Sequence, residues 1–139
     1  MEVVQQVATY LETQGLGTLD EDIFIVDARE NDPDVCVVIN QNSRDRKALS
    51  SFPANDYSFQ FFVRSVDPVA GLQKVNAIAD LFTMDTSQAQ DLRNGHLIPE
   101  EDGGNQVIFT ELISGPASLG LDKSKKYCNV VNVLMRILN

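Results

Sequence analysis

The sequence has few of the side chains that catalysis and metal binding require. It contains a single histidine, His96, and two cysteines in 139 residues. His96 follows Asn94-Gly95, a pair typical of hairpin turns, and no serine or cysteine motif accompanies it, so an exposed hairpin histidine is favoured over a general base. Two cysteines and one histidine are too few for a structural zinc site. The sequence therefore predicts no enzyme activity, no metal and no cofactor.

Two glycine-containing stretches lack the features of ligand-binding loops. "GLG" at residues 15–17 follows a predicted helix rather than a strand, and it has neither the third glycine of a dinucleotide loop nor the lysine of a phosphate loop. Glu100, Glu101 and Asp102 precede Gly103, but the alternating ligand positions of a calcium loop are missing. We expect both stretches to be turns, with the three carboxylates facing water.

Long apolar runs are also missing. No run approaches the roughly 20 residues that a membrane-spanning helix needs. The opening "MEVVQQVATY" has no basic region followed by an apolar one, so we expect neither a secretory signal nor a membrane partner. Cys36 and Cys128 lie in apolar runs typical of strands, which favours two buried, reduced thiols in a cytosolic setting over a disulfide.

Basic residues are scarce in the first third of the chain. The net charge is −9, and residues 1–43 hold nine acids against one basic residue, Arg29. The remaining 96 residues hold ten basic and eleven acidic residues. An acidic surface repels nucleic acid, although the same charge could serve solubility alone. The length predicts one domain, residues 1–139, with a sizeable core.

The pattern in the middle of the chain predicts a strand followed directly by a helix. In "YSFQFFVR", residues 57–64, apolar side chains alternate with polar ones except at Phe62. Asp67 can cap the first turn of a helix, and Pro68 suits its first position. Apolar residues then recur every three or four positions through residues 69–82. A helix that lies across a sheet is therefore expected here.

The rest of the chain predicts a second helix and further strands. Residues 3–11 have helical spacing, and Gly15 is a suitable stop. "DIFIVDA" and "DVCVVIN" read as strands joined by the polar turn "RENDPD", and the second is apolar on both faces, as in a central strand. After the middle helix we expect four strands, beginning with a hairpin at Asn94-Gly95. The predicted class is α+β: a mainly antiparallel sheet with two helices packed on it and a projecting loop or hairpin.

Two polar stretches stand out: residues 40–56 are predicted to be a long loop or an extended arm, and residues 115–126 a loop. The first has little periodicity, and the second is rich in glycine, proline and lysine. Because loops often carry binding residues, we expect contact loops for assembly, with a merely solvated surface as the alternative. They hold six of the eleven basic residues, the candidate interface residues Arg44, Arg46, Lys47, Lys123, Lys125 and Lys126.

Three segments together resemble the tail terminator proteins of long-tailed bacteriophages, a family that includes proteins called minor capsid or tail-completion proteins. The first is "YLETQGLGTL" followed by "DIF". The second is "YSFQFFVRSVDPVAGLQKVNAIADLF", and the third is "ISGPASLGLDKSKKYCNVVNVLMRIL". They occur in the order expected for the family and cover most of the chain.

The resemblance implies a structural role in the virion. Such proteins form a ring, typically a hexamer, on the last ring of tail tube protein at the head-proximal end of the tail. They stop tube elongation and present a surface to the head–tail connector protein, and DNA passes through the lumen without specific binding. Assembly would take place in the cytoplasm of the host bacterium. An acidic lumen would suit DNA passage, since like charges bind poorly.

Three alternatives remain open. A neck or head-completion protein of the same phage would also assemble into the virion, but on the portal side, and its co-purifying partner would distinguish it. A non-catalytic adaptor domain would stay monomeric and bind a peptide. A small hydrolase would need His96 near an acid and a nucleophile. Comparing the hydrolase activity of wild type and a His96→Ala variant would test this alternative.

Overall fold

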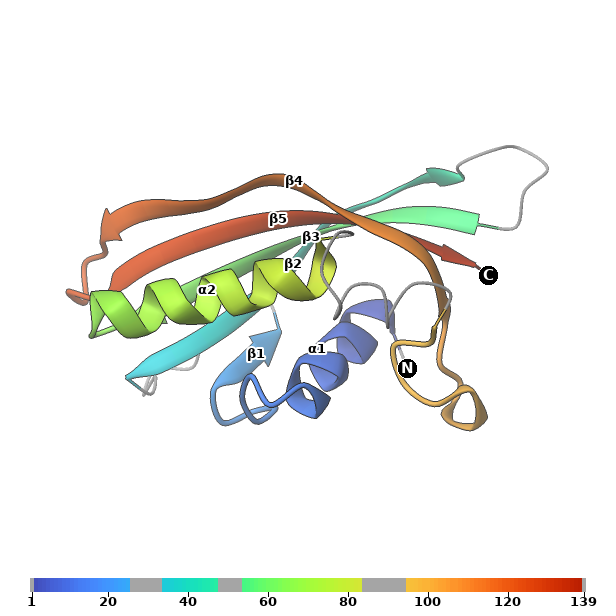
Figure 1. Ribbon diagram of the computed structural model, residues 1–139, viewed down its shortest axis with the longest axis horizontal. Helices are drawn as coiled ribbons and strands as arrows, with labels where there is room; N and C mark the ends of the chain where they lie inside the picture. Colours follow the sequence, from blue (N-terminus) through green and yellow to red (C-terminus); the bar gives the residue numbers. More distant parts are fainter. Residues whose placement is uncertain (1, 26–33, 48–53, 84–94, 139) are drawn as a thin grey trace.

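The structure, a computed structural model, describes residues 2–25, 34–47, 54–83 and 95–138. Figure 1 shows a long twisted sheet with helices on one of its faces. The elements in chain order are α1 (Val3–Thr13), β1 (Ile23–Ile25), β2 (Val35–Lys47), β3 (Ala54–Ser65), α2 (Pro68–Phe82), the short 3-10 helix η1 (Glu100–Asp102), β4 (Gln106–Leu121) and β5 (Tyr127–Leu138). This arrangement confirms the predicted α+β class.

The five strands form one sheet in the order β1-β2-β3-β5-β4. The pairs β2–β3, β3–β5 and β4–β5 are antiparallel, whereas β1 and β2 are parallel. The prediction of two strands in this region is right, and their pairing is parallel. Residues 26–33, which contain most of the expected turn, lie outside the described residues.

The strand β2 was expected at the centre of the sheet because it is apolar on both faces. It does lie inside the sheet, between β1 and β3, and residues 36–39 are buried. The middle position, however, belongs to β3, which pairs along its whole length with β5. β3 therefore serves as the axis along which the rest of the molecule can be placed.

The core lies between the sheet and the two helices. Along β3, buried and half-buried residues alternate, which confirms the period-2 prediction. Both helices and all five strands contribute to one buried cluster. Its largest fully buried members include Phe59, Phe61, Phe82, Leu11, Ile39 and Met135.

Both predicted helices are present. Asp67 caps α2, since its carboxylate accepts a hydrogen bond from the Val69 backbone N–H at 2.9 Å, and Pro68 occupies the first position. Only part of the predicted apolar stripe is buried, however. Val69 and Leu72 are 60% and 50% exposed, so the first turns of α2 leave apolar side chains in contact with solvent.

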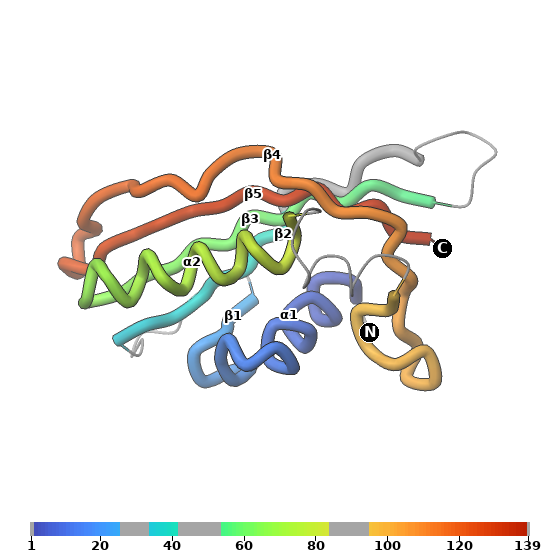
Figure 2. The backbone as a smooth tube through the Cα atoms, viewed as in Figure 1, coloured from blue at the N-terminus to red at the C-terminus, as the bar shows by residue number. Residues whose placement is uncertain are grey.

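Both polar stretches are mostly strand: residues 40–47 agree with the extended arm rather than the long loop, and the loop expected over residues 115–126 is wrong for 115–121. Residues 40–47 continue β2 and pair with β3 as far as Lys47 opposite Asn55. Residues 115–121 belong to β4, and only 122–126 connect it to β5. Figure 2 shows β3 reaching beyond the helical layer, and Figure 1 shows the end of β2 beside it, which accounts for the lack of an apolar pattern in residues 40–47. The hairpin tip, residues 48–53, is outside the described residues.

The region after α2 contains fewer strands than the four expected. The described residues hold β4, β5 and an isolated antiparallel bridge between His96 and Gln106. Asn94, the first residue of the expected hairpin turn, lies outside them. The connection that the structure does describe runs through η1 and Gly103, whose positive φ of 83° suits glycine, as the expected turn at "EEDGGN" requires.

Candidate assembly surfaces

The six candidate interface residues form two separate groups. We call Arg44, Arg46 and Lys47 the arm cluster, since they lie on the part of β2 that reaches beyond the helices, and residues 122–126 the basic turn. Lys47 pairs with Asn55 at one end of β3, and Tyr127, next to the basic turn, pairs with Ser65 at the other end.

The distance between the groups follows from strand geometry. β3 has 12 residues, and a strand rises about 3.3 Å per residue, so the two groups lie roughly 35–40 Å apart. The structure therefore does not bring the six residues into one patch. It gives the subunit a basic group at each end of its long axis.

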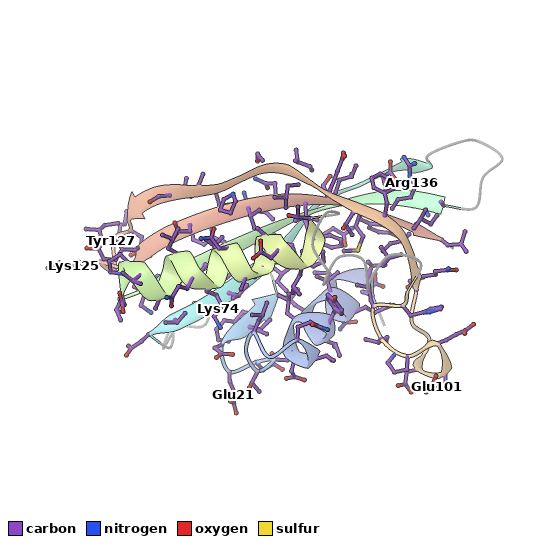
Figure 3. The ribbon with its side chains drawn as sticks, viewed as in Figure 1. Glu21, Lys74, Glu101, Lys125, Tyr127 and Arg136 are labelled. Atoms are coloured by element: carbon purple, nitrogen blue, oxygen red, sulfur yellow. The ribbon has the colours of Figure 1, made fainter. Side chains whose placement is uncertain are left out.

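The basic turn is held in shape by the side chain of Asp122. One carboxylate oxygen, Oδ1, accepts hydrogen bonds from the backbone N–H groups of Ser124 at 2.8 Å and Lys126 at 3.0 Å. The backbone carbonyl of Asp122 accepts a third bond, from the Lys125 N–H at 3.0 Å. Lys125 has a φ of 60°, in the left-handed region, and it points away from the sheet in Figure 3. The lysines are thus displayed on a well-defined turn.

The other oxygen of Asp122 ties the turn to the sheet. Oδ2 accepts from Arg64 on β3, with Nε at 2.9 Å and a second guanidinium nitrogen at 2.8 Å. The hydrogen bond from the Lys126 backbone, with those from Arg64 and Ser124, lowers the pKa of Asp122, and burial opposes them. The turn is therefore fixed to the central strand as well as to its neighbours.

The thiol of Cys128 lies against the same carboxylate. Its Sγ is 3.7 Å from Oδ2 of Asp122, and burial followed by the negative charge of Asp122 raises its pKa. A thiol with a raised pKa is a poor nucleophile at neutral pH. Cys36 and Cys128 are both buried and unlinked, as the sequence predicted.

We expect Asp122→Ala to loosen the basic turn and to lower the free energy of unfolding by about 1 kcal/mol at pH 7, a modest value because the side chain is partly exposed. Since folding lowers the pKa of Asp122 from 3.8, its contribution is present above that value and is lost as the pH falls through the folded-state pKa. Urea unfolding at pH 7 and near pH 2.5 measures this.

The expected result is a difference between wild type and variant that shrinks in acid. The exposed Glu101→Ala serves as a control that should change little at either pH. An Asp122→Ala difference that is equally large near pH 2.5 would show that the ionised carboxylate does not hold the turn.

A second ion pair fixes the base of the β2–β3 arm. Arg136 on β5 donates to both carboxylate oxygens of Asp56 on β3, at 2.7 and 3.1 Å. The Asp56 hydrogen bond raises the pKa of Arg136, and its guanidinium also lies 4.8 Å from the centre of the Phe109 ring. These contacts join β3, β5 and β4, and Asp56 is next to Asn55, the residue that pairs with Lys47.

The acidic residues gather on the side of the molecule that carries α1. Figure 3 places Glu21 and Glu101 on this side, while Lys125 lies at the far tip of the β4–β5 ribbon. The exposed acids here are Glu2, Glu12, Asp20, Glu21, Glu100, Glu101 and Asp102. Other exposed acids among the described residues lie elsewhere, at Asp34, Asp67, Asp80 and Glu111.

A groove of about 730 Å³ lies between α1 and the segment around η1. Two hydrogen bonds between Gln6 and Asn105 hold the two walls together. The Gln6 side-chain Nε2 donates to Asn105 Oδ1 at 2.7 Å, and Gln6 Oε1 accepts from the Asn105 backbone N–H at 2.9 Å. Its lining is Thr9, Tyr10, Thr13, Gln14, His96, Leu97, Ile98, Pro99, Glu100 and Asp102. We call it the acidic groove, because its only charged lining residues are Glu100 and Asp102.

His96 is half-buried in this groove rather than exposed on a hairpin. The groove also contains the two carboxylates and two threonine hydroxyls, but no hydrogen bond among the described residues joins His96 to any of them. Within the same residues, no group of three or more histidine, cysteine, aspartate or glutamate side chains could hold a metal ion. No helix found there is long and apolar enough to cross a membrane.

The sequence analysis missed an apolar surface at the end of the molecule that carries the basic turn. We call it the apolar end: Val66, Val69 and Leu72 near the start of α2, and Leu119 and Leu121 at the end of β4, all between 48% and 60% exposed. A signal was available in "LISGPASLGL", residues 112–121, which contains no charged residue although β4 is an edge strand.

Comparisons with known proteins assign no family: no protein-family model matches the chain, and no curated protein matches it significantly.

Proposed function

We propose that this protein is a phage tail terminator: a virion structural protein, not an enzyme, that forms a ring on the last ring of the tail tube, stops its elongation and provides the surface to which the head is joined. The ring is a homo-oligomer, in our proposal a hexamer. Its partners are the tail tube protein on one side and the head–tail connector protein on the other. The three segments that resemble the tail terminator family support this proposal.

The observation that carries the proposal is the two-ended shape of the subunit. A capping ring needs one surface for the tube, another for the connector, and two different patches for its neighbours in the ring. The chain offers the arm cluster at one end of β3 and the basic turn with the apolar end at the other. The ion pair between Asp122 and Arg64 fixes the basic turn to β3, so this surface can bind without rearrangement.

The distribution of charge also suits a channel for DNA. The acids on the α1 side form a surface that DNA does not bind, because the two carry charge of the same sign. With this side toward the lumen, DNA could pass through the ring during ejection without being retained. The basic groups at the two ends would then face protein partners.

We expect the triple variant Arg44→Ala, Arg46→Ala, Lys47→Ala to fold normally and to assemble poorly. Normal folding is expected because the pairing of β2 with β3 depends on backbone hydrogen bonds. Single exposed ion pairs contribute about 1 kcal/mol or less, but their loss is repeated at every subunit of a ring. Electron microscopy of tails made with wild-type protein should show one ring at the head-proximal end, and the variant should reduce the number of tails that carry it.

A variant with Arg29→Ala and Arg93→Ala, at two basic residues outside both groups, controls for the loss of positive charge alone. Wild-type ring occupancy with the triple variant would remove the arm cluster from the interface. Wild-type protein spread along the tube, or bound at the opposite tip, would contradict the tail terminator function itself.

A further inference from the structure

The apolar end and the basic turn form one continuous part of the chain's tip. β4 ends at Leu121, directly before the basic turn, and β5 begins at Tyr127, directly after it. Tyr127 pairs with Ser65 at the end of β3, and α2 begins three residues after Ser65. Large exposed apolar side chains gathered at one place usually mark a contact surface. Here the apolar side chains are accompanied by exposed Lys123 and Lys125 and by exposed Asp67, whose carboxylate accepts a hydrogen bond from the Val69 N–H. A matching partner would offer an apolar pocket with a negative rim.

The acidic groove has this composition. Tyr10, Leu97, Ile98 and Pro99 provide apolar surface, Glu100 and Asp102 provide the charge, and no lysine or arginine is among its described lining residues. Its volume, about 730 Å³, is within the range of pockets that enclose a sizeable ligand, so it can accept more than one apolar side chain. Because Gln6 and Asn105 hold its walls together, the groove exists before anything binds.

We infer that the acidic groove receives the tip of a second copy of this chain, with Leu119 and Leu121 in the pocket and Lys123 and Lys125 beside Glu100 and Asp102. The tip of the same chain does not lie at this groove, since Figure 3 places Lys125 and Glu101 at opposite ends of the molecule. The contact joins two different surfaces of identical subunits. It is therefore heterologous and leads to a closed ring when the rotation between subunits permits.

The inference rests on the proposed function, because it names the surfaces by which neighbouring subunits of the ring bind each other. In this contact the apolar end and the basic turn bind the neighbouring subunit, so the arm cluster remains for the tube or the connector. The charges set the orientation and the specificity of the contact, and the leucines exclude water from it.

Charge exchange between the two surfaces tests the inference. One variant, the reversed tip, carries Lys123→Glu and Lys125→Glu, and the other, the reversed groove, carries Glu100→Lys and Asp102→Lys. None of these side chains makes a hydrogen bond or ion pair with a described residue, so both variants should fold, which circular dichroism verifies. Self-association is measured by sedimentation velocity and native mass spectrometry up to about 1 mM protein.

Wild-type protein should form oligomers within this range, and each variant alone should need at least about tenfold higher concentration. An equimolar mixture of the two variants should assemble again, because each reversed tip meets a reversed groove and each normal tip a normal groove. The mixed oligomers should contain the two variants in equal numbers, which native mass spectrometry can count. A single chain that carries all four substitutions should also assemble.

Glu21→Lys, a charge reversal at an exposed acid outside the groove, is the control and should leave assembly unchanged. Wild-type protein that stays monomeric up to about 1 mM, or a mixture that does not recover, would overturn the inference. If the mixture does not recover while wild-type rings are found on tails, only this contact is wrong. If the charge exchange succeeds but the protein is absent from tails, the tail terminator function fails and the contact stands.

Discussion

Particles made without this protein are expected to have intact heads and tails of abnormal length. Tube subunits stack head to tail, so the contact between successive rings is heterologous and does not close along the tail axis. The last ring always exposes a surface that can bind another ring. Unless a different protein covers that surface, growth continues past the correct length.

The described residues are suited to such capping by binding alone. Stopping growth needs no turnover, only one surface that binds the last ring and another that does not bind a further ring. In our inference the basic turn binds the neighbouring subunit, which leaves the arm cluster, at the opposite end of β3, available for the tube or the connector. We therefore expect abnormal length rather than a slower rate of assembly.

The measurement is the distribution of tail lengths in negatively stained particles from a phage that lacks the gene. Wild-type protein supplied from a plasmid is the control and should restore one length. Tails of normal length that join heads efficiently would place the protein elsewhere, and the neck and adaptor alternatives would then lead. Normal tails that fail to join heads would favour the neck alternative in particular.

Much of the fold could be predicted wherever one face of an element is buried. Residues 57–64 alternate because β3 turns one face to the helices, and Asp67-Pro68 marks the start of α2 by its capping chemistry. The same reasoning found α1 and both cysteine-bearing strands. In these places the pattern of side chains and the burial of the backbone have the same cause.

The extended ends of the sheet could not be predicted for the opposite reason. Residues 40–47 reach beyond the helices (Figure 1), and residues 115–121 lie on the edge strand β4 with their side chains exposed. No core imposes an alternating pattern in either place, and the two segments are held by backbone pairing with β3 and β5. Polar, glycine-containing sequence therefore indicated loops. The direction of β1 was missed because pairing direction depends on the path between strands and not on either strand's own residues.

The candidate site was only partly accessible from the sequence. The six basic residues could be named, but not that they occupy opposite ends of the sheet. The acidic groove depends on contacts between segments far apart in the chain, such as Gln6 with Asn105. The exposure of Val69 and Leu72 likewise depends on where α2 begins relative to the sheet, and their helical spacing alone predicted burial.

Replacing Phe61 with alanine is expected to lower the free energy of unfolding by about 3–5 kcal/mol. Phe61 is fully buried, and its ring stacks on that of Phe82 from α2, with 5.3 Å between the ring centres. On the sheet it lies between Ile39 of β2 and Val131 of β5. Because neighbours on both sides and above are fixed, the surrounding residues cannot close the cavity that the variant leaves.

Phe62→Ala is the matched control, since Phe62 is the next residue on the same strand. It faces the other side of the sheet, is only half-buried and packs against the small cluster that contains Phe24 and Val38. Its loss should cost about 1–2 kcal/mol. Urea unfolding at a protein concentration too low for self-association compares the two variants.

Equal losses for the two variants would mean that the helices do not cover this face of the sheet as the structure shows. A large loss at Phe61 alone would also predict how this variant fails in particles. Since a domain has roughly 5–15 kcal/mol of stability in total, Phe61→Ala should reduce the amount of folded protein, and tails should become abnormal through its shortage. Overexpression should then restore tail length for Phe61→Ala, whereas it should not do so for a variant whose binding surface is altered.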